Sequence, residues 1–509
     1  MKRFVAGSFI IIMLIVLLSA ALLVAGCVSG QKATTSPASA ADDLFAKAGL
    51  EFNNANYRTA TRLSTLAQEN YTAAGNAASA LKARDKASIA RRMTIEFPLN
   101  RTQAEQAIAA AFPDVPAERR AGWLSDNQSI KIRSDGEELF FFDTVGNIWF
   151  HNPDLMQKRT AGMNRTPLYD QVKSFALSPK AGGAGPYVNP VTWEGSQQLS
   201  IPRGELPKSG TLILWVPVPI ESGSQTNVTI FSVEPSRYVR SLTGTKADIG
   251  LVYLEIPLDQ VSGDFLNVTT RFWFTQAEQR FVIDPAKVGS YNISDPLYRK
   301  YTAPGTSLVI TPEIRTKAQE IVGNETNPYR KAQKIYWHIM DTLPYSHVPH
   351  VRLDTAGIPE PTYVLSTGFG DCGSQSMYFA ALCRAVGVPT RAIGGYQLVP
   401  GNEGTHFWAE YYLEGYGWIP VDVTIAEGAD WSYDATPDER HRFKEYYFSS
   451  LDPYRYIIQN DVDIPIVPDP GDTVMYRMVV QTPKIVCDTC TIDPELILEN
   501  HWTTTVKKV

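Results

Sequence analysis

Apolar positions change their spacing several times along the chain, and the first block, residues 42–93, is alanine-rich and helical in period. It contains no proline and only two glycines, so it predicts two or three helices that resemble a tetratricopeptide-type helical hairpin. One such repeat cannot bury its own apolar face. A helical stalk or packing element is therefore favoured over a partner-binding module.

Residues 95–190 mix helical and strand-like patterns and contain no recognisable catalytic motif. The glycine-rich stretch 181–186 ends this region as a linker. The expected helices are 102–112 and 117–124, and the expected strands are 130–133, 138–142 and 147–150.

Residues 191–285 carry several short apolar runs separated by turn-forming residues, which predicts an antiparallel β-sandwich-like domain. The expected strands are 198–201, 211–219, 227–233, 251–256 and 266–274.

Residues 305–460 carry the candidate chemistry. Two helices are expected at 311–322 and 328–340, the first capped by Thr311. After the glycine-rich run 368–373, a third helix begins at Cys372. Because a helix start presents free N–H groups and positive partial charge, this position favours a reactive thiolate. Cys383, in the middle of the same helix, fits a buried structural thiol.

Residues 405–423 predict a β-hairpin whose turn lies near 415–417. With a three-residue loop, His406 lies opposite Thr424 and diagonal to Asp422, on the same face of the hairpin. A cysteine at a helix start with a histidine and an aspartate on adjoining strands matches nucleophilic catalysis, in which the acid orients the imidazole and the imidazole takes the thiol proton.

These residues resemble the transglutaminase-like core family in the segments 370–373, 382–389, 395–396, 406–410 and 417–422. The resemblance spans roughly residues 310–425. It implies a papain-like α+β fold with Cys372 as nucleophile, His406 as general base and Asp422 as the third member of a catalytic triad. It also implies acyl transfer through a thioester, followed by hydrolysis or by transfer to an amine.

An oxyanion hole would complete this mechanism, and the backbone N–H of Cys372 is one natural donor. Tyr345 is the candidate for the second. Trp408 and Trp418 could wall an acyl pocket or pack within the hairpin. His347 and His350 lie in a loop before the nucleophile and are expected to contribute to the substrate groove. No adjacent ligand set completes a metal site around them, so neither a metal nor another cofactor is expected.

The formal net charge is −6, and the absence of a long basic run gives no case for nucleic-acid binding. Residues 1–27 begin with Lys2 and Arg3, continue as an apolar run and end in a sequence that resembles a lipobox, with Cys27 as the lipidated residue. A retained signal anchor is the alternative. Either reading tethers the body to the cell membrane on its extracytoplasmic face, through the flexible segment 28–41.

Eight asparagines open Asn-X-Ser/Thr triplets, all of them outside residues 364–423. With the lipobox, they suit an archaeal surface glycoprotein. They are Asn70, Asn100, Asn127, Asn164, Asn227, Asn267, Asn292 and Asn324.

The C-terminal extension, residues 461–509, follows an expected closing strand at 452–458 and carries another at 474–483. Cys487 and Cys490 are expected to form a local disulfide in an oxidising compartment. A redox motif or a zinc site is disfavoured, because no βαβ context and no further ligands accompany the pair.

The sequence thus predicts a multidomain α+β protein with an N-terminal helical hairpin, an antiparallel β-sandwich-like domain and a papain-like transglutaminase core. The leading function is an extracytoplasmic cysteine peptidase or amidase that hydrolyses protein or peptide amide bonds through a thioester on Cys372. Protein-glutamine cross-linking is the first alternative. A non-catalytic surface binding or assembly protein is the second.

Overall fold

The computed structural model describes residues 37–125, 129–163, 167–178, 185–471, 474–490 and 492–509. The predicted membrane anchor with Cys27, most of the glycine-rich linker, Asn127 and Asn164 lie outside these residues. Among the helices of the described ranges, none is both long enough and apolar enough to cross a bilayer.

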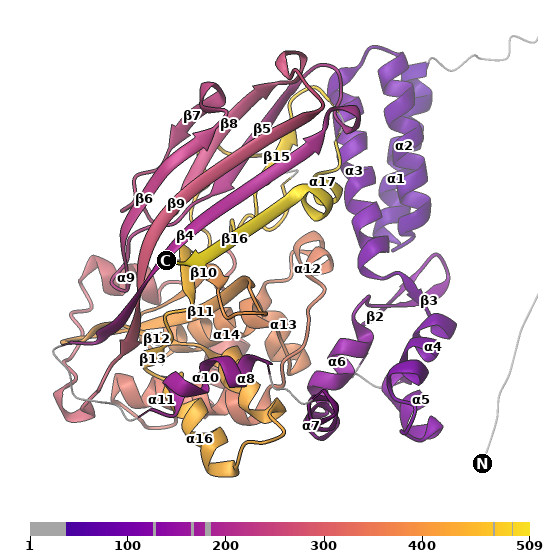
Figure 1. The fold of residues 1–509 in the computed structure, drawn as a ribbon. Coiled ribbons are helices and arrows are strands. Elements are labelled where there is room, and N and C mark those ends of the chain that lie inside the picture. Colours follow the sequence, from indigo (N-terminus) through magenta and orange to yellow (C-terminus); the bar gives the residue numbers. More distant parts are fainter. Residues whose placement is uncertain (1–36, 126–128, 164–166, 179–184, 472–473, 491) are drawn as a thin grey trace, which may run out of the picture.

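Three helices, within the two or three expected, form the N-terminal layer at the right of Figure 1. They pack in sequence order, and alanines such as Ala60, Ala67 and Ala83 are fully buried between them. Small side chains let the helices approach closely, which explains the alanine-rich composition. The helices are α1 (Pro37–Asn53), α2 (Tyr57–Ala73) and α3 (Ala77–Glu96).

The next region folds as a small α+β unit below α3. The strand expected at 147–150 is wrong, because these residues lie in α6. Asp143 caps that helix by accepting a hydrogen bond from the Gly146 N–H at 3.1 Å. The elements of this unit are β1 (Leu99–Asn100), α4 (Arg101–Ala111), α5 (Ala117–Ser125), β2 (Lys131–Ser134), β3 (Glu137–Phe140), α6 (Thr144–His151) and α7 (Pro153–Gly162). The next helix, α8 (Pro167–Ala176), packs instead into the core described below.

The predicted antiparallel β-domain is confirmed as two facing sheets. Leu199 and Val268 of one sheet pack against Leu214 and Leu254 of the other. The strands are β4 (Tyr187–Pro202), β5 (Thr211–Pro217), β6 (Gln225–Glu234), β7 (Val239–Leu242), β8 (Leu251–Pro257) and β9 (Phe265–Arg280). The short 3₁₀ turns are η1 (Arg203–Glu205), η2 (Ser236–Tyr238), η3 (Leu258–Gln260) and η4 (Pro285–Lys287).

The end of the chain returns to this sandwich and adds a strand to each sheet. β15 (Lys484–Cys487) pairs with β5, and β16 (Trp502–Lys508) pairs with β4 after α17 (Pro494–His501). The strand expected at 474–483 is wrong, because the strand begins at Lys484. The C-terminal extension therefore completes the β-domain, and the catalytic core is inserted between its strands.

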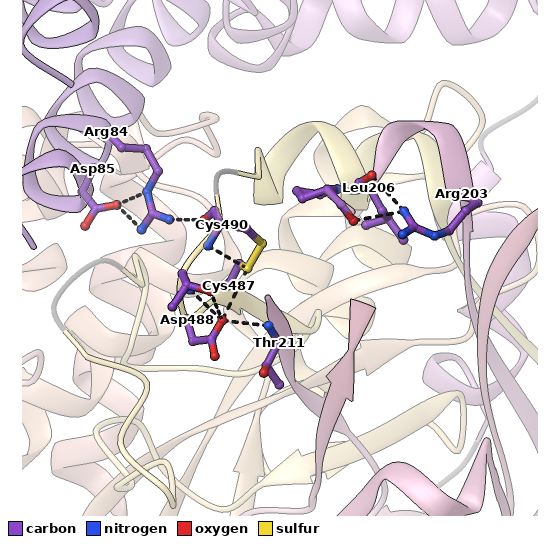
Figure 2. The surroundings of a disulfide bond; sticks show 10 residues. Arg84, Asp85, Arg203, Leu206, Thr211, Cys487, Asp488 and Cys490 are labelled. Carbon is purple, nitrogen blue, oxygen red and sulfur yellow. Dashed lines mark hydrogen bonds and ion pairs between the residues drawn. A yellow bond between two sulfur atoms is a disulfide. The ribbon is translucent and has the colours of Figure 1, made fainter. Parts of the chain in front are cut away.

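A disulfide joins Cys487 and Cys490 at the end of β15, as the spacing predicts. Figure 2 shows its surroundings: Arg84 of α3 donates to the Cys490 carbonyl at 2.5 Å, and the Thr211 N–H donates to Asp488 at 2.7 Å. The disulfide loop therefore contacts both the N-terminal helices and the sandwich.

The core places one buried helix, α14, against the four-stranded antiparallel sheet β12-β11-β10-β14. The two helices expected before it are confirmed, and Thr311 and Asn327 cap them. The helices are α9 (Pro296–Thr302), α10 (Pro312–Val322), α11 (Pro328–Thr342), α12 (His350–Ala356), α13 (Glu360–Thr367), α14 (Cys372–Ala385), α15 (Val423–Glu427), η5 (Gly428–Trp431) and α16 (Pro437–Tyr446). The strands are β10 (Thr390–Gln397), β11 (Gly404–Leu413), β12 (Gly417–Val421), β13 (Ser450–Leu451) and β14 (Arg455–Gln459).

The sandwich also supports the core sheet from behind. Phe272 and Phe274 of β9 pack against Tyr456 of β14. Gln225 of β6 exchanges hydrogen bonds with the backbone of Ile457, accepting from its N–H at 2.8 Å and donating to its carbonyl at 2.9 Å. These contacts fix the position of β14, which carries a buried arginine of the site described below.

Candidate active site

Cys372 is the first residue of α14, and its thiol is half-buried. The preceding residue, Asp371, caps the helix by accepting from the Ser374 N–H at 2.9 Å. Cys372 packs against a buried cluster that includes Phe407. Phe407 is the neighbour of His406, so the thiol lies beside the strand that carries the expected base.

Burial raises the pKa of the Cys372 thiol well above its ordinary value, and the adjacent Asp371 carboxylate adds to this effect. The N–H groups of Phe407 and Gly373 oppose it without outweighing it. Burial therefore opposes the effect expected of the helix start, and a base beside the thiol would favour loss of its proton.

His406 and Asp422 meet as the hairpin register predicts. Leu413 pairs with Gly417 across a three-residue loop, as expected, and the pairing extends to Ala409 and Val421. Asp422 follows directly as the cap of α15, so Thr424 lies in that helix and not opposite His406. The Nε2 atom of His406 lies 2.8 Å from Oδ2 of Asp422, and both side chains are buried. This geometry uses Nε2 and leaves Nδ1 as the ring nitrogen that can exchange a proton with the thiol.

The Asp422 carboxylate accepts hydrogen bonds from two further groups besides His406. It accepts from the Ile425 N–H at 3.0 Å, as the cap of α15, and from Nη1 of Arg455 at 2.7 Å. Burial alone would raise the pKa of Asp422, but His406 and Arg455 outweigh it and keep the pKa below its ordinary value. The carboxylate therefore stays ionised next to the imidazole.

Arg455 is a site residue that the sequence did not reveal. It is completely buried, and its second nitrogen donates to Asp452 at 2.6 Å, so one guanidinium joins two carboxylates. Its guanidinium carbon lies 5.5 Å from the centre of the Trp408 ring. The only sequence signal is an arginine that begins an otherwise apolar strand, where a lone charge needs a buried partner.

The two tryptophans pack within the hairpin rather than forming an acyl pocket. Trp408 is fully buried between His406 and Arg455. Trp418 contacts Tyr301 and Tyr412 and supports the Arg391 guanidinium, whose carbon lies 4.2 Å from the ring centre. Neither ring lines the cavities around Cys372 described below.

A second histidine is tied to the residue before the nucleophile. Nε2 of His350 lies 2.6 Å from Oδ2 of Asp371, and its Nδ1 lies 2.8 Å from Oε1 of Glu360. Burial alone would lower the pKa of His350, but the carboxylates of Asp371 and Glu360 outweigh it and hold the pKa well above its ordinary value. In turn, despite burial, His350 helps to lower the pKa of Asp371 to about 2. The sequence did not predict this cluster, because His350, Glu360 and Asp371 are far apart along the chain.

His347 contacts the region 95–190, in which the sequence shows no catalytic motif. Its Nδ1 is hydrogen-bonded to Asp143, the cap of α6. No group of three or more His, Cys, Asp or Glu side chains in the described ranges is arranged to hold a metal ion. His347 and His350 are thus each paired with carboxylates beside the nucleophile.

Two cavities, each of about 310 Å³, meet at Cys372. The first is shared by Cys372, His406 and Tyr345 and is mostly apolar, so the candidate oxyanion donor Tyr345 does line the same space as the thiol. The second is lined by His350, Asp371 and Lys484 and carries charge. Both cavities have mostly apolar walls, and the charged side chains of Asp371 and Lys484 distinguish the second from the first.

Six of the eight asparagine triplets fall on described residues. Asn70 is half-buried on α2, where its amide donates to the Leu66 carbonyl at 2.8 Å. The other five side chains are exposed, namely Asn100, Asn227, Asn267, Asn292 and Asn324. Their glycosylation stays a prediction.

Residues 315–423 match the family model of the transglutaminase-like superfamily. Cys372, His406 and Asp422 all lie within the matched residues. This part of the chain is a transglutaminase-like domain, in agreement with the core of helix α14 and sheet β12-β11-β10-β14.

A relative from Haemophilus influenzae, an uncharacterized protein, is 31% identical over 145 residues, which cover 23% of this chain and 38% of the relative. A solved structure from Cytophaga hutchinsonii, described as a candidate cysteine protease, gives a TM-score of 0.36 at 14% identity, covering 59% of this chain and 98% of that one. The periplasmic domain of TgpA from Pseudomonas aeruginosa gives a TM-score of 0.22 at 15% identity, covering 50% of this chain and 93% of that one.

Proposed function

We propose that the protein is a cysteine-dependent acyl-transfer enzyme that hydrolyses amide bonds of proteins or peptides through a thioester on Cys372. The observation that carries this proposal is the buried contact of 2.8 Å between His406 and Asp422 beside a half-buried thiol. A buried histidine with an ionised carboxylate on one ring nitrogen is organised to accept a proton on the other.

The first half of the reaction forms the thioester. Sγ of Cys372 attacks the amide carbonyl carbon while His406 takes the thiol proton, and Asp422 stabilises the imidazolium. The tetrahedral oxyanion can accept a hydrogen bond from the Cys372 N–H, which is free at the helix start. The C–N bond then breaks, and the leaving amine takes the proton from His406.

The second half restores the enzyme. Water attacks the thioester carbonyl carbon, and His406 takes one of its protons. The C–S bond breaks, the acid is released, and the proton returns to the sulfur. An amine in place of water would give a new amide bond, which is the cross-linking alternative.

We further propose that the protein works outside the cytoplasm, tethered to the cell membrane by residues 1–27. The sequence pattern of this segment supports the proposal, and so does the disulfide between Cys487 and Cys490, since disulfides persist mainly in oxidising compartments. Labelling of intact cells with a membrane-impermeant reagent, followed by mass spectrometry of surface peptides, tests it. Recovery of this protein only after lysis contradicts it.

The enzymatic proposal is tested by two readouts on the full-length protein in detergent. The first is cleavage of a peptide library, with new termini identified by mass spectrometry; attachment of a labelled amine to glutamine, without cleavage, favours cross-linking instead. The second is iodoacetamide labelling of Cys372. Because burial raises the thiol pKa, labelling should be slow at pH 6 and should accelerate toward pH 9.

Cys372→Ala is the control for the first readout, and Cys383 is an internal control for the second because it is buried. Loss of cleavage in Cys372→Ala with unchanged folding supports the proposal. Full biological function of Cys372→Ala would instead favour the non-catalytic binding protein.

A further inference from the structure

The apolar cavity at Cys372, called here the aromatic pocket, is walled mainly by residues outside the matched range 315–423. α6, α7 and α8 contribute Phe150, Met156, Leu168 and Tyr169, and η5 contributes Trp431. Cys372 and His406 line the same cavity. A region that shows no catalytic motif therefore forms one side of the candidate active site.

Hydrogen bonds hold this wall in place. The side chain of Asn147 on α6 donates to the His347 carbonyl at 3.1 Å and accepts from the His347 N–H at 2.7 Å. On α7, Thr160 donates to the Trp431 carbonyl at 3.1 Å, and Gln157 donates to the Asp430 carbonyl at 2.6 Å. The two helices are thus fixed to the segments before Cys372 and after Asp422. A pocket built this way is organised before a ligand enters.

Aromatic rings line the approach to the sulfur. The centre of the Phe150 ring lies 4.8 Å from that of Tyr345, 5.0 Å from that of Trp431 and 5.4 Å from that of His347. Phe150 and Trp431 are only half-buried although they contact each other. Their remaining exposed faces offer apolar area that a bound group can cover.

The chemistry of the lining is selective. Among the described residues that line the aromatic pocket there is no Asp, Glu, Lys or Arg, and its charged-type side chains are limited to His347 and His406, each already bonded to an aspartate. A charged group that entered would lose its water and find no oppositely charged side chain, although the amides of Gln397 and Asn402 lie in the same lining. The second cavity, with Asp371 and Lys484, differs in this respect.

We propose that the aromatic pocket receives a bulky apolar side chain, aromatic or long aliphatic, of the peptide substrate next to the amide bond under attack. That a peptide substrate occupies the pocket rests on the proposed function. The preference of the pocket for apolar groups depends only on the residues around the Cys372 thiol. The cavity of about 310 Å³ lies at the lower end of the range typical of small-ligand sites, which suits one side chain.

The test measures alkylation of Cys372 by two iodoacetamides, one with a benzyl group on nitrogen and one with a carboxyethyl group. Each rate is divided by that of the same reagent with glutathione, and full-length protein is used. The benzyl reagent should be favoured by about 10-fold or more. Leu168→Glu places a carboxylate at the half-buried edge of the pocket and should remove this preference. Leu242→Glu, an equal change at an exposed position on β7, should leave it intact.

A ratio near one in the unchanged protein overturns the pocket proposal, and so does a preference that Leu168→Glu does not alter. If Leu168→Glu fails to fold, Phe150→Ala gives the same decision, because loss of the ring should lower the benzyl preference several-fold. Peptide cleavage separates the two proposals. A benzyl preference without any cleavage supports the pocket proposal and contradicts the proposed peptidase function. Cleavage without a benzyl preference supports the peptidase function and contradicts the pocket proposal.

Discussion

His406 and His350 are both held by carboxylates beside the nucleophile, and they differ in which ring nitrogens remain available. His406 bonds Asp422 through Nε2, and Arg455 balances the charge of that carboxylate. His350 has both ring nitrogens bonded, to Asp371 and to Glu360. A ring with one available nitrogen can exchange protons, whereas a ring bonded on both sides is held as a cation. The comparison thus marks His406 as the candidate base and His350 as a cation that stabilises the structure around Asp371.

The largest expected effect is on His406. His406→Ala should lower kcat/KM for the cleaved peptide by about 10⁴- to 10⁶-fold, because the thiol then has no base for its proton. Steady-state kinetics on a library-derived peptide measure it. His441→Ala, which changes an exposed histidine of α16, is the matched control and should retain full activity. Activity within 10-fold of the unchanged protein would remove His406 from the mechanism.

Asp422→Asn should lower kcat by about 10³- to 10⁴-fold, since the amide no longer stabilises the imidazolium or fixes its tautomer. Asp461→Asn is the matched control: Asp461 is also buried and accepts from an arginine, Arg384, at 2.7 Å, away from the histidine. It should lose stability but retain turnover per folded molecule. Equal losses of turnover in the two variants would show that burial of a carboxylate, rather than its contact with His406, is what matters.

Arg455→Met should lower the free energy of unfolding by about 3–5 kcal/mol, because Asp422 and Asp452 would remain buried without their cation. Urea unfolding followed by circular dichroism measures the loss. Arg391→Met provides the comparison, since Arg391 pairs with Glu410 at 2.6 Å and also stacks on a tryptophan of this hairpin. Both variants should be destabilised, but only Arg455→Met should also change the pH dependence of turnover. An unchanged profile in both would contradict this role for Arg455.

His350→Gln should have the smallest effect, a loss of about 1–3 kcal/mol in the free energy of unfolding with turnover reduced at most several-fold. The pKa of His350 is raised above its ordinary 6.5 on folding, so its stabilisation is complete below pH 6.5 and disappears as the pH rises through the folded value. Asp371, with a pKa of about 2 instead of 3.8, stabilises above pH 3.8 and loses this contribution as the pH falls through 2.

The difference between the unchanged protein and His350→Gln should therefore be full between about pH 4 and 6 and should shrink at alkaline pH. The nearby carboxyl groups of Glu96 and Asp354 titrate in the same surroundings. Measuring both proteins across the whole range removes their shared contribution. His501→Gln, whose partner Glu205 is exposed, controls for loss of a surface histidine pair. A difference that grows with pH would contradict the assigned charge of His350.

Local sequence signals were enough to predict where the core helices begin and where the hairpin turns. Thr311 caps α10, Cys372 begins α14, and the three-residue loop fixed the register of the hairpin that carries His406. The Arg455–Asp422 and His350–Asp371 contacts join segments that no local pattern relates. From the sequence alone, these arginine, histidine and aspartate residues could equally be charged residues on the surface.

The errors have similar causes. Residues 147–150 carry turn and apolar signals in a stretch too short for periodicity to distinguish a strand from a helix, and the Asp143 cap decides for α6. The burial that opposes the helix start at Cys372 was also missed, because it depends on Phe407 and the surrounding core. The pocket wall was missed because packing side chains carry no motif.

The pairing of β15 and β16 with β5 and β4 has a consequence for the order of events during synthesis. When the ribosome has made β4 to β9, one sheet still lacks β15 and the other lacks β13 and β16. Most of the core must be produced before β15 and β16 emerge. The sandwich therefore closes last, around a long inserted loop, so its pairing has a high contact order and is expected to be slow. A nascent chain released before residue 484 would expose an unpaired edge on β5, and such edges invite aggregation.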